Sequence, residues 1–177
     1  MTRHFFGYGS LVNRATHNYP NAKAATLTGW RRAWVHTAVR PLAYLSVIRD
    51  SSCSIQGLVA EVPGGDWAAL DAREYGYTRH ADTVPHDTSP LPVHIYAVPA
   101  AAARAPVAAH PILLSYLDTV IQGFLREYGP QGAAHFFETT TGWNAPILND
   151  RAAPRYPRAQ SLTDAERAVV DEGLAGV

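Results

Sequence analysis

The chain has 177 residues, of which 15 are Lys or Arg and 15 are Asp or Glu, so its formal net charge at pH 7 is zero. Hydrophobic residues make up 47% and charged residues 17% of the sequence, as in an ordinary globular domain with a substantial core. The basic residues are spread along the chain, which argues against a nucleic-acid partner because nucleic-acid-binding surfaces cluster Lys and Arg. The length predicts one domain over residues 1–177.

Cys53 is the only cysteine, which excludes an internal disulfide and a cysteine-based zinc site. The eight histidines lack the spacing of metal ligands, so we expect no metal. Residues 1–7 are too short, and too soon interrupted by glycine, to be a signal peptide. No window of about eighteen apolar residues is free of charge, so we expect no membrane-spanning segment and a cytoplasmic location.

Strand patterns dominate the first half of the chain, where aromatic and β-branched residues lie between Gly and Pro turns. Strands are predicted at residues 3–7, 25–50 with a break at Arg40-Pro41, 54–62, 77–84 and 91–98. Helices are predicted at 66–76, at 111–128 between Pro111 and Gly129-Pro130, and at 164–174, where Thr163 and Glu166 form a capping box. Strands followed by helices indicate an α+β domain with a largely antiparallel sheet or barrel.

The short helix at 66–76 carries the first candidate functional residue. Asp66 is a favourable N-cap, and Gly76 is a favourable stop because glycine adopts the left-handed conformation without strain. Trp67, Leu70 and Glu74 fall at i, i+3 and i+7 and so share one face of the helix. A carboxylate on this apolar face would have a raised pKa and would exchange protons near neutrality, as a general acid and base does.

A second interpretation of Glu74 remains open at this point. Glu74 can instead be a boundary residue whose carboxylate reaches water or pairs with Arg73 or Arg79, since such ion pairs imitate active sites.

The second candidate site is Gly7-Tyr8-Gly9-Ser10-Leu11, which follows the first strand. Two glycines around a tyrosine allow a tight turn and a close approach to a ligand, and successive amides in such a turn can bind an anion. Val12 stands where a dinucleotide-binding fingerprint or a nucleophile elbow requires glycine, so neither motif is present. The alternative is a plain turn between a strand and a loop.

Two features leave the sequence open to several interpretations. The segment 143–160 is aperiodic and rich in proline, and it is either a lid, a strap that binds a partner, or a surface loop, of which the loop is the default. The protein is expected to be a monomer or a homodimer, and Trp30 or Trp34 would favour the dimer if either were exposed on an edge strand.

The order of these motifs resembles the γ-glutamylcyclotransferase-like superfamily. The resemblance covers most of residues 4–130 and rests on an ordered set of motifs: Phe-Gly-Tyr-Gly-Ser-Leu, Gly-Trp-Arg-Arg-Ala-Trp, a strand led by Gly57, Leu70-Asp71-x-x-Glu74, Tyr77-x-Arg79, and the helix from Tyr116 to Gly123. It implies a small mixed or antiparallel β-barrel flanked by helices. Residues beyond about 140 match no motif of the family, and we expect residues 143–177 to form a C-terminal extension that packs on this barrel. It also implies an enzyme without a cofactor that cleaves small γ-glutamyl amides by cyclisation and releases 5-oxoproline and a free amine.

The resemblance also implies roles for individual residues. Tyr8, Gly9, Ser10 and Leu11 would hold the substrate's α-carboxylate through main-chain amides, and Glu74 would be the acid/base. Tyr77 or another nearby tyrosine could polarise the carbonyl. Many members have a polar residue where this chain has Leu11, and the leucine form resembles the glutathione-specific branch.

Two rivals to a peptide-cleaving cyclotransferase follow from the same cavity. The first is a non-catalytic ligand-binding or regulatory module, against which Glu74 argues because burying an unpaired acid is costly. The second is an enzyme that acts on a γ-glutamyl-amine conjugate instead of a peptide.

Overall fold

The computed structural model describes residues 3–86 and 89–177, so the first two residues of the N-terminal segment considered above lie outside it. Within this range the strands are β1 (Arg3–Gly7), β2 (Lys23–His36), β3 (Ala43–Val62), β4 (Thr78–Val84), β5 (Leu91–Ala97), β6 (Ile112–Leu113), β7 (Thr140–Thr141) and β8 (Ile147–Leu148). The helices are α1 (Ala68–Arg73), α2 (Leu114–Glu138) and α3 (Asp164–Ala175).

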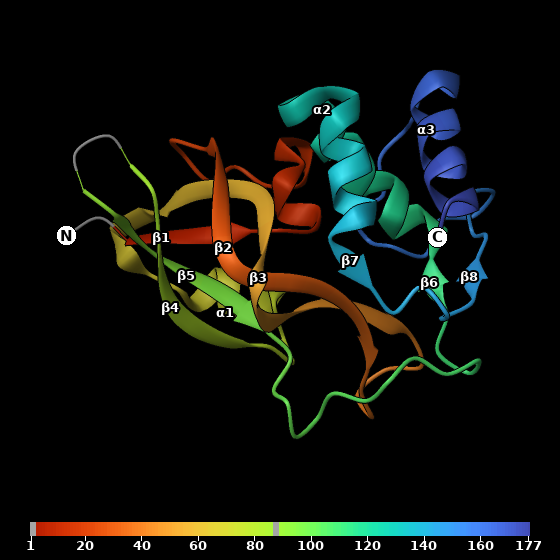
Figure 1. Ribbon diagram of the computed structural model, residues 1–177, viewed down its shortest axis with the longest axis horizontal. Coiled ribbons are helices and arrows are strands. Elements are labelled where there is room, and N and C mark those ends of the chain that lie inside the picture. The colour runs from red at the N-terminus through yellow and green to blue at the C-terminus, as the bar shows by residue number, and fades with distance from the viewer. Residues whose placement is uncertain (1–2, 87–88) are drawn as a thin grey trace.

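Six strands form one mixed, curled sheet in the order β4-β5-β1-β3-β2-β7, and β6 pairs with β8 in a second, two-stranded sheet. The pairs β1–β3, β2–β3 and β4–β5 are antiparallel, whereas β1–β5 and β2–β7 are parallel. Figure 1 shows the long strands β2 and β3 bending together, so that the sheet becomes a half-barrel. The α+β fold with a small mixed barrel flanked by helices is thereby confirmed.

Side chains connect β4 at one end of the curled sheet to β2 and β3 near the other. The indole Nε1 of Trp30 on β2 donates to the Asp82 carboxylate on β4 at 2.8 Å. Arg49 on β3 donates to the same oxygen at 3.0 Å and stacks on the Trp30 ring. Trp30 and Trp34 are 3% and 1% exposed, so both belong to the core and neither provides an exposed surface for a dimer.

The sheet is covered on both faces, and the alternation of β1 shows how the sequence achieves this. Phe5 packs in a cluster with Trp67 and Leu70 beneath α1, whereas Phe6 packs in the larger cluster beneath α2. Successive strand residues point to opposite faces of the sheet, so these two adjacent phenylalanines pack in two different hydrophobic clusters. Helix α3 lies against α2 on the outer side of the larger cluster (Figure 1), where the Phe137 ring contacts Gly173.

Several element boundaries differ from the sequence predictions. Residues 43–62 form one continuous strand, because the segment before Ser54 pairs with β2 along most of its length. Pro111 does not begin α2: residues 112–113 pair with β8 first, and the helix begins at Leu114. Gly129 does interrupt the helix, with φ 70°, but Pro130 starts a second helical stretch that continues to Glu138.

The predicted Thr163–Glu166 capping box is confirmed at the start of α3. The predicted bounds of the helix at 66–76 are wrong at both ends: Trp67, not Asp66, occupies the N-cap position of α1, although the Asp66 carboxylate accepts from the Ala68 amide at 2.9 Å. The helix ends at Arg73, and Gly76 follows in the next turn with φ 94°. Although α2 spans 25 residues, no helix in the described ranges is both long and apolar enough to cross a bilayer.

Candidate active site

The structure brings the predicted residues from Tyr8 to Leu11, Glu74 and Tyr77 together around one small cavity. Five further residues complete its wall: Phe6 and Gly7 at the end of β1, Leu45 on β3, Tyr96 on β5 and Tyr116 in the first turn of α2. The cavity volume is about 30 Å³, which accommodates about one water molecule. A γ-glutamyl group can therefore enter only when lining side chains move.

The loop after β1 contains two 3₁₀ turns, Ser10–Val12 and Arg14–Thr16, of which the first lines the cavity. The amides of Val12 and Asn13 bond back to the carbonyls of Gly9 and Ser10, at 2.9 and 3.1 Å. The amides of Ser10 and Leu11 precede these bonded positions and so have no partner within the turn; the Ser10 amide instead donates to the Tyr116 hydroxyl. Their position at the cavity wall agrees with an anion-binding function of this loop.

Gly9 is required by close packing against α2. A Cβ placed at this position would lie 2.7 Å from the Tyr116 hydroxyl oxygen and 3.1 Å from Leu45 Cδ2. Any side chain here would therefore displace Tyr116 from the cavity.

Glu74 follows directly after α1 and is oriented by the apolar face that the sequence predicts. Trp67 and Leu70 are 6% and 0% exposed, and the Glu74 amide bonds to the Leu70 carbonyl at 2.9 Å. The Glu74 side chain is 18% exposed, and burial raises the pKa of its carboxyl, an effect that Arg73 and Arg158 partly oppose. The raised pKa suits a group that takes up and releases a proton near neutrality.

Both interpretations of Glu74 describe part of its surroundings. Its carboxylate lies 3.4 Å from Arg73 Nε, as the ion-pair interpretation expects for Arg73. Arg79 instead pairs with Asp71 at 3.0 Å and stacks on Trp67. Glu74 is therefore a largely buried acid that pairs with Arg73, which has other hydrogen-bond partners, and that also feels the charge of Arg158.

Two of the cavity tyrosines are bound to main-chain carbonyls. The Tyr8 hydroxyl donates to the Tyr96 carbonyl at 2.7 Å, and the Tyr77 hydroxyl donates to the Leu45 carbonyl at 2.9 Å. Burial raises the pKa of both hydroxyls, so both remain protonated near neutral pH. Tyr77 must therefore give up its bond to Leu45 before it can polarise a substrate carbonyl.

Tyr116 is a site residue that the sequence reasoning did not single out. Burial contributes most to the raised pKa of the Tyr116 hydroxyl, and the nearby Tyr156 and Glu74 raise it further. A hydrogen bond from the Ser10 amide lowers this pKa, but its effect is smaller. An accepted bond leaves the hydroxyl proton free to donate. In the sequence, the helix from Tyr116 to Gly123 resembles a motif of the γ-glutamylcyclotransferase-like superfamily, and this was a signal for Tyr116. The role of Tyr116 in the site, however, depends on packing between α2 and the loop after β1.

Tyr96 was also missed, for a different reason. The alternation of residues 91–98 predicts one buried face, opposite Tyr96, yet Tyr96 is 3% exposed. It lies in the cluster that α1 covers, and its hydroxyl donates to Asp71 at 2.5 Å. The sheet is buried on both faces here, so alternation alone could not predict its burial.

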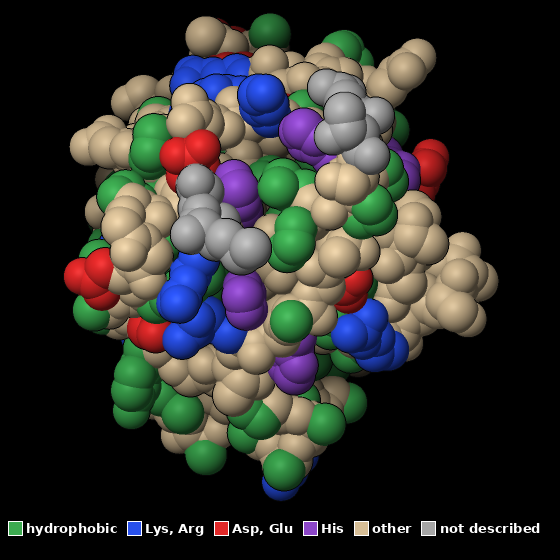
Figure 2. Space-filling view, turned by 90° about the vertical axis from the view of Figure 1, so that its left-hand side faces the viewer, with side chains coloured by type: hydrophobic (Ala, Val, Ile, Leu, Met, Phe, Trp, Pro, Cys, Tyr) green, Lys and Arg blue, Asp and Glu red, His purple; other side chains and the backbone are tan. Residues whose placement is uncertain are grey.

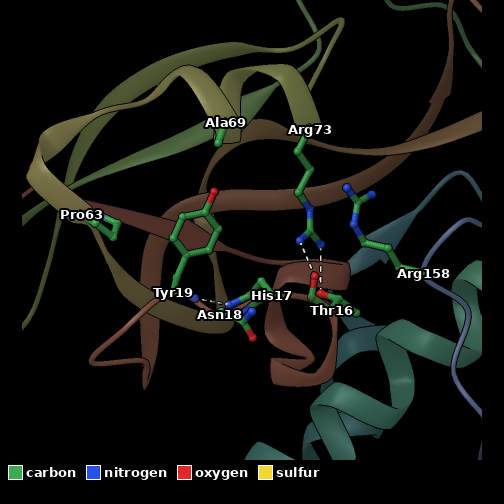
Figure 3. A pocket seen from close by; sticks show the side chains of 8 residues that line it. All are labelled: Thr16, His17, Asn18, Tyr19, Pro63, Ala69, Arg73 and Arg158. Atoms are coloured by element: carbon green, nitrogen blue, oxygen red, sulfur yellow. Dashed lines mark hydrogen bonds between the residues drawn. The ribbon is translucent and has the colours of Figure 1, made fainter.

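Arg73 joins the loop to the turn that carries Glu74. Its guanidinium donates to the Thr16 carbonyl at 2.9 Å, to the Thr16 hydroxyl at 3.0 Å and to the Ser10 hydroxyl at 3.3 Å. On its other side lies a larger cavity of about 320 Å³, which Figure 3 shows between the 16–19 segment, α1 and Arg158.

The C-terminal segment 143–160 reaches this region by binding to the start of α2. Asp150 accepts from the Ser115 amide at 2.8 Å, from the Ser115 hydroxyl at 2.6 Å and from the Arg155 amide at 2.8 Å. The Tyr156 ring packs edge-on against Tyr116, with 5.0 Å between the ring centroids. The segment therefore supports one cavity tyrosine and places Arg158 at the second cavity.

Histidines gather on a different face of the molecule, which Figure 2 shows together with several basic side chains. Strands β1, β4 and β5, which lie on that side in Figure 1, carry His4, His80 and His94. Within residues 3–86 and 89–177, no three His, Cys, Asp or Glu side chains are grouped so that they could hold a metal ion.

The fold and the site together define an α+β half-barrel protein with a buried glutamate that faces a glycine-flanked tyrosine loop. A family model described as "Gamma-glutamyl cyclotransferase, AIG2-like" matches residues 5–114, well over half of the chain. The chain therefore belongs to the AIG2-like gamma-glutamyl cyclotransferase family. The matched range contains Tyr8 to Leu11, Glu74 and Tyr77, and it ends before Tyr116 and Arg158.

Solved structures support the fold at low sequence identity. A gamma-glutamyl cyclotransferase is 13% identical, with a TM-score of 0.61 over 97% of this chain and 99% of that one. YkqA from Bacillus subtilis is 17% identical, with a TM-score of 0.59 over 80% of this chain and 56% of that one. The uncharacterized protein loc79017 from Homo sapiens is 15% identical, with a TM-score of 0.59 over 96% and 98%. No curated protein matches the sequence.

Proposed function

We propose that the protein is a γ-glutamyl cyclotransferase that releases 5-oxoproline and a free amine or amino acid from a small γ-glutamyl amide. The observation that carries this proposal is that the buried Glu74 carboxylate faces the same cavity as the loop Tyr8–Leu11. Family membership supports the reaction class.

The reaction needs little from the protein beyond positioning and proton transfer. The nucleophile is the substrate's own α-amine, so a fixed, folded conformer replaces a bimolecular encounter. In the proposed complex the Ser10 amide exchanges its bond to the Tyr116 hydroxyl for one to the substrate, and the amides of Ser10 and Leu11 together hold the α-carboxylate, which places the α-nitrogen near Glu74. Tyr116, whose hydroxyl proton is free to donate, stabilises the oxyanion that forms on the γ-carbon.

Glu74 carries the protons between the two nitrogens. A new bond forms between the α-nitrogen and the γ-carbon, and the α-nitrogen gives a proton to the Glu74 carboxylate. The tetrahedral intermediate then collapses, the bond between the γ-carbon and the leaving nitrogen breaks, and Glu74 returns that proton to the leaving nitrogen. A carboxyl whose pKa is raised by burial can serve in both steps.

The test is release of 5-oxoproline from glutathione, γ-glutamyl dipeptides and γ-glutamyl-amines. We expect turnover of at least one of them by the wild type and a loss of at least about a hundredfold in kcat in Glu74→Gln. Glu172→Gln, an exposed substitution of the same kind on α3, is the control and should keep full activity.

Two results would contradict the proposal. Full activity in a folded Glu74→Gln variant would remove the acid/base function from this residue. Thermal stabilisation by γ-glutamyl compounds without any 5-oxoproline would instead identify a ligand-binding or regulatory module that uses the same cavity.

A further inference from the structure

The larger cavity beside the proposed active site has the size and charge of an anion-binding pocket. Its volume of about 320 Å³ lies within the range of small-molecule sites. Arg73 and Arg158 both line it, and none of its lining residues among those described is acidic. Figure 3 shows the two guanidinium groups on the same side of the cavity, with Tyr19 on the other side.

The two cavities share a wall. Arg73 lines the larger cavity, donates to the hydroxyl of Ser10 in the wall of the smaller one, and lies 3.4 Å from the Glu74 carboxylate. A γ-glutamyl group in the smaller cavity would therefore have its scissile amide at Glu74. The leaving group would extend past Arg73 into the larger cavity.

Hydrogen bonds within the protein distinguish the two arginines. Arg73 donates three hydrogen bonds to Thr16 and Ser10, and its Nε faces Glu74, so four of the five donors of its guanidinium are already directed at protein groups. Arg158 is exposed, and among the described residues its guanidinium forms no hydrogen bond or ion pair. Its planar set of donors fits a carboxylate in two-point contact.

On the basis of the proposed function, we propose that this cavity binds a carboxylate of the leaving group, with Arg158 as the donor and Arg73 as the fixed positive charge. The preferred substrates are therefore γ-glutamyl amino acids or peptides, and γ-glutamyl-amines, which lack this carboxylate, are poor substrates. Arg158 belongs to the C-terminal segment outside the family match, so this preference is carried by the part of the chain that the family model does not cover.

A matched pair of substrates tests the proposal. γ-Glutamylalanine and γ-glutamylethylamide differ only in that the first has a carboxylate where the second has a hydrogen. We expect kcat/KM to favour γ-glutamylalanine by about tenfold or more, since a hydrogen bond between charged groups has an effect of this size. Arg158→Gln should bring the ratio of the two kcat/KM values close to one, and Arg158→Lys, which keeps the charge but not the planar donors, should give an intermediate ratio.

Arg155→Gln is the matched control, because Arg155 lies three residues earlier in the same segment and does not line the cavity. It should leave the substrate ratio unchanged. A wild-type ratio near one, or an equal loss for both substrates in Arg158→Gln, would overturn the proposal. The equal loss would show that Arg158 holds the glutamyl α-carboxylate, which both substrates share.

Equilibrium binding separates this proposal from the proposed reaction. Titration calorimetry of both compounds with Glu74→Gln, and with Glu74→Gln combined with Arg158→Gln, measures the same preference without turnover. Tighter binding of γ-glutamylalanine that depends on Arg158 would support the anion subsite even if the wild type released no 5-oxoproline. Equal binding of both compounds would overturn the subsite even if turnover were observed.

Discussion

The guanidinium of Arg32, which is fully buried, donates through Nε to the main-chain oxygen of Tyr8 at 2.9 Å. Its other nitrogens donate to the Thr139 hydroxyl at 2.6 Å and to the Gln56 carbonyl. Its charge also lies over the rings of Phe124 and Phe136. Arg32 thus connects β2, β3 and α2 to Tyr8, the residue before Gly9 in the loop after β1.

Replacement of Arg32 by Met should lower the free energy of unfolding by about 3 kcal/mol or more, because buried carbonyls that lose their donor stay unsatisfied. Urea unfolding measures this change. Arg31→Met is the control: Arg31 is the neighbouring residue and pairs with Asp50 near the surface, so its loss should cost about 1 kcal/mol or less. Equal losses in the two variants would show that the buried arginine has no special structural role.

Arg32 also illustrates a feature that cannot be predicted from the sequence. Gly-Trp-Arg-Arg-Ala-Trp predicts a strand, but it does not indicate which arginine faces the core, since that depends on Phe124 and Phe136, about a hundred residues away. Features that depend on a few neighbouring residues could be predicted, such as the capping box of α3 and the position of Glu74 on the same side as the buried Trp67 and Leu70. Tyr116 and Arg158 could not be placed, because tertiary packing alone brings them to the two cavities.

Glu74→Gln should make the protein more stable near neutral pH while it removes activity. Burial raises the pKa of Glu74 in the folded state above that in the unfolded chain. The stability that depends on the protonated carboxyl is therefore present below the unfolded-state pKa and is lost as pH rises through the folded-state pKa. Glutamine stays neutral at every pH, so the variant avoids this loss.

Thermal unfolding of the wild type and Glu74→Gln at neutral pH and near pH 4 measures this effect, with a stability difference expected only at the higher pH. Arg73 keeps its bonds to Thr16 and Ser10 in the variant, so no new unpaired buried charge opposes the gain. A Glu74→Gln variant that is less stable at neutral pH would mean that the ion pair with Arg73 outweighs the cost of burial.

In the wild type, kcat should rise with pH through the raised pKa of Glu74, since the carboxyl must be ionised to act as a base.

Tyr116→Phe should reduce kcat by about a hundredfold, the usual effect of removing one donor to an oxyanion. Tyr77→Phe should have a smaller effect on kcat, because the Tyr77 hydroxyl already donates to the Leu45 carbonyl. It should instead lower the free energy of unfolding by about 1 kcal/mol. Steady-state kinetics and urea unfolding of both variants separate the two roles, and the reverse pattern would assign carbonyl polarisation to Tyr77.

Asp150→Asn should destabilise the start of α2 and, through it, the anion subsite. Burial raises the pKa of Asp150, but hydrogen bonds from Ser115 and from the Arg155 amide outweigh burial and lower it. Its stabilising effect is therefore present above the unfolded-state pKa and is lost as pH falls through the folded-state pKa. At neutral pH the variant should lose about 1–3 kcal/mol, because Asp150 acts as a helix cap and its carboxylate accepts three hydrogen bonds.

The same substitution connects stability to substrate choice. Asp150 holds the chain at Ser115 and Arg155, and Arg158 follows three residues later, so a looser segment should lower the preference for γ-glutamylalanine over γ-glutamylethylamide. Asp164→Asn, at a fully exposed carboxylate on α3, is the control and should change the free energy of unfolding by about 0.5 kcal/mol or less. If Asp150→Asn lost stability but kept the full substrate preference, Arg158 would be held at the cavity by contacts other than this cap, and Tyr156 packed on Tyr116 would be the next contact to remove.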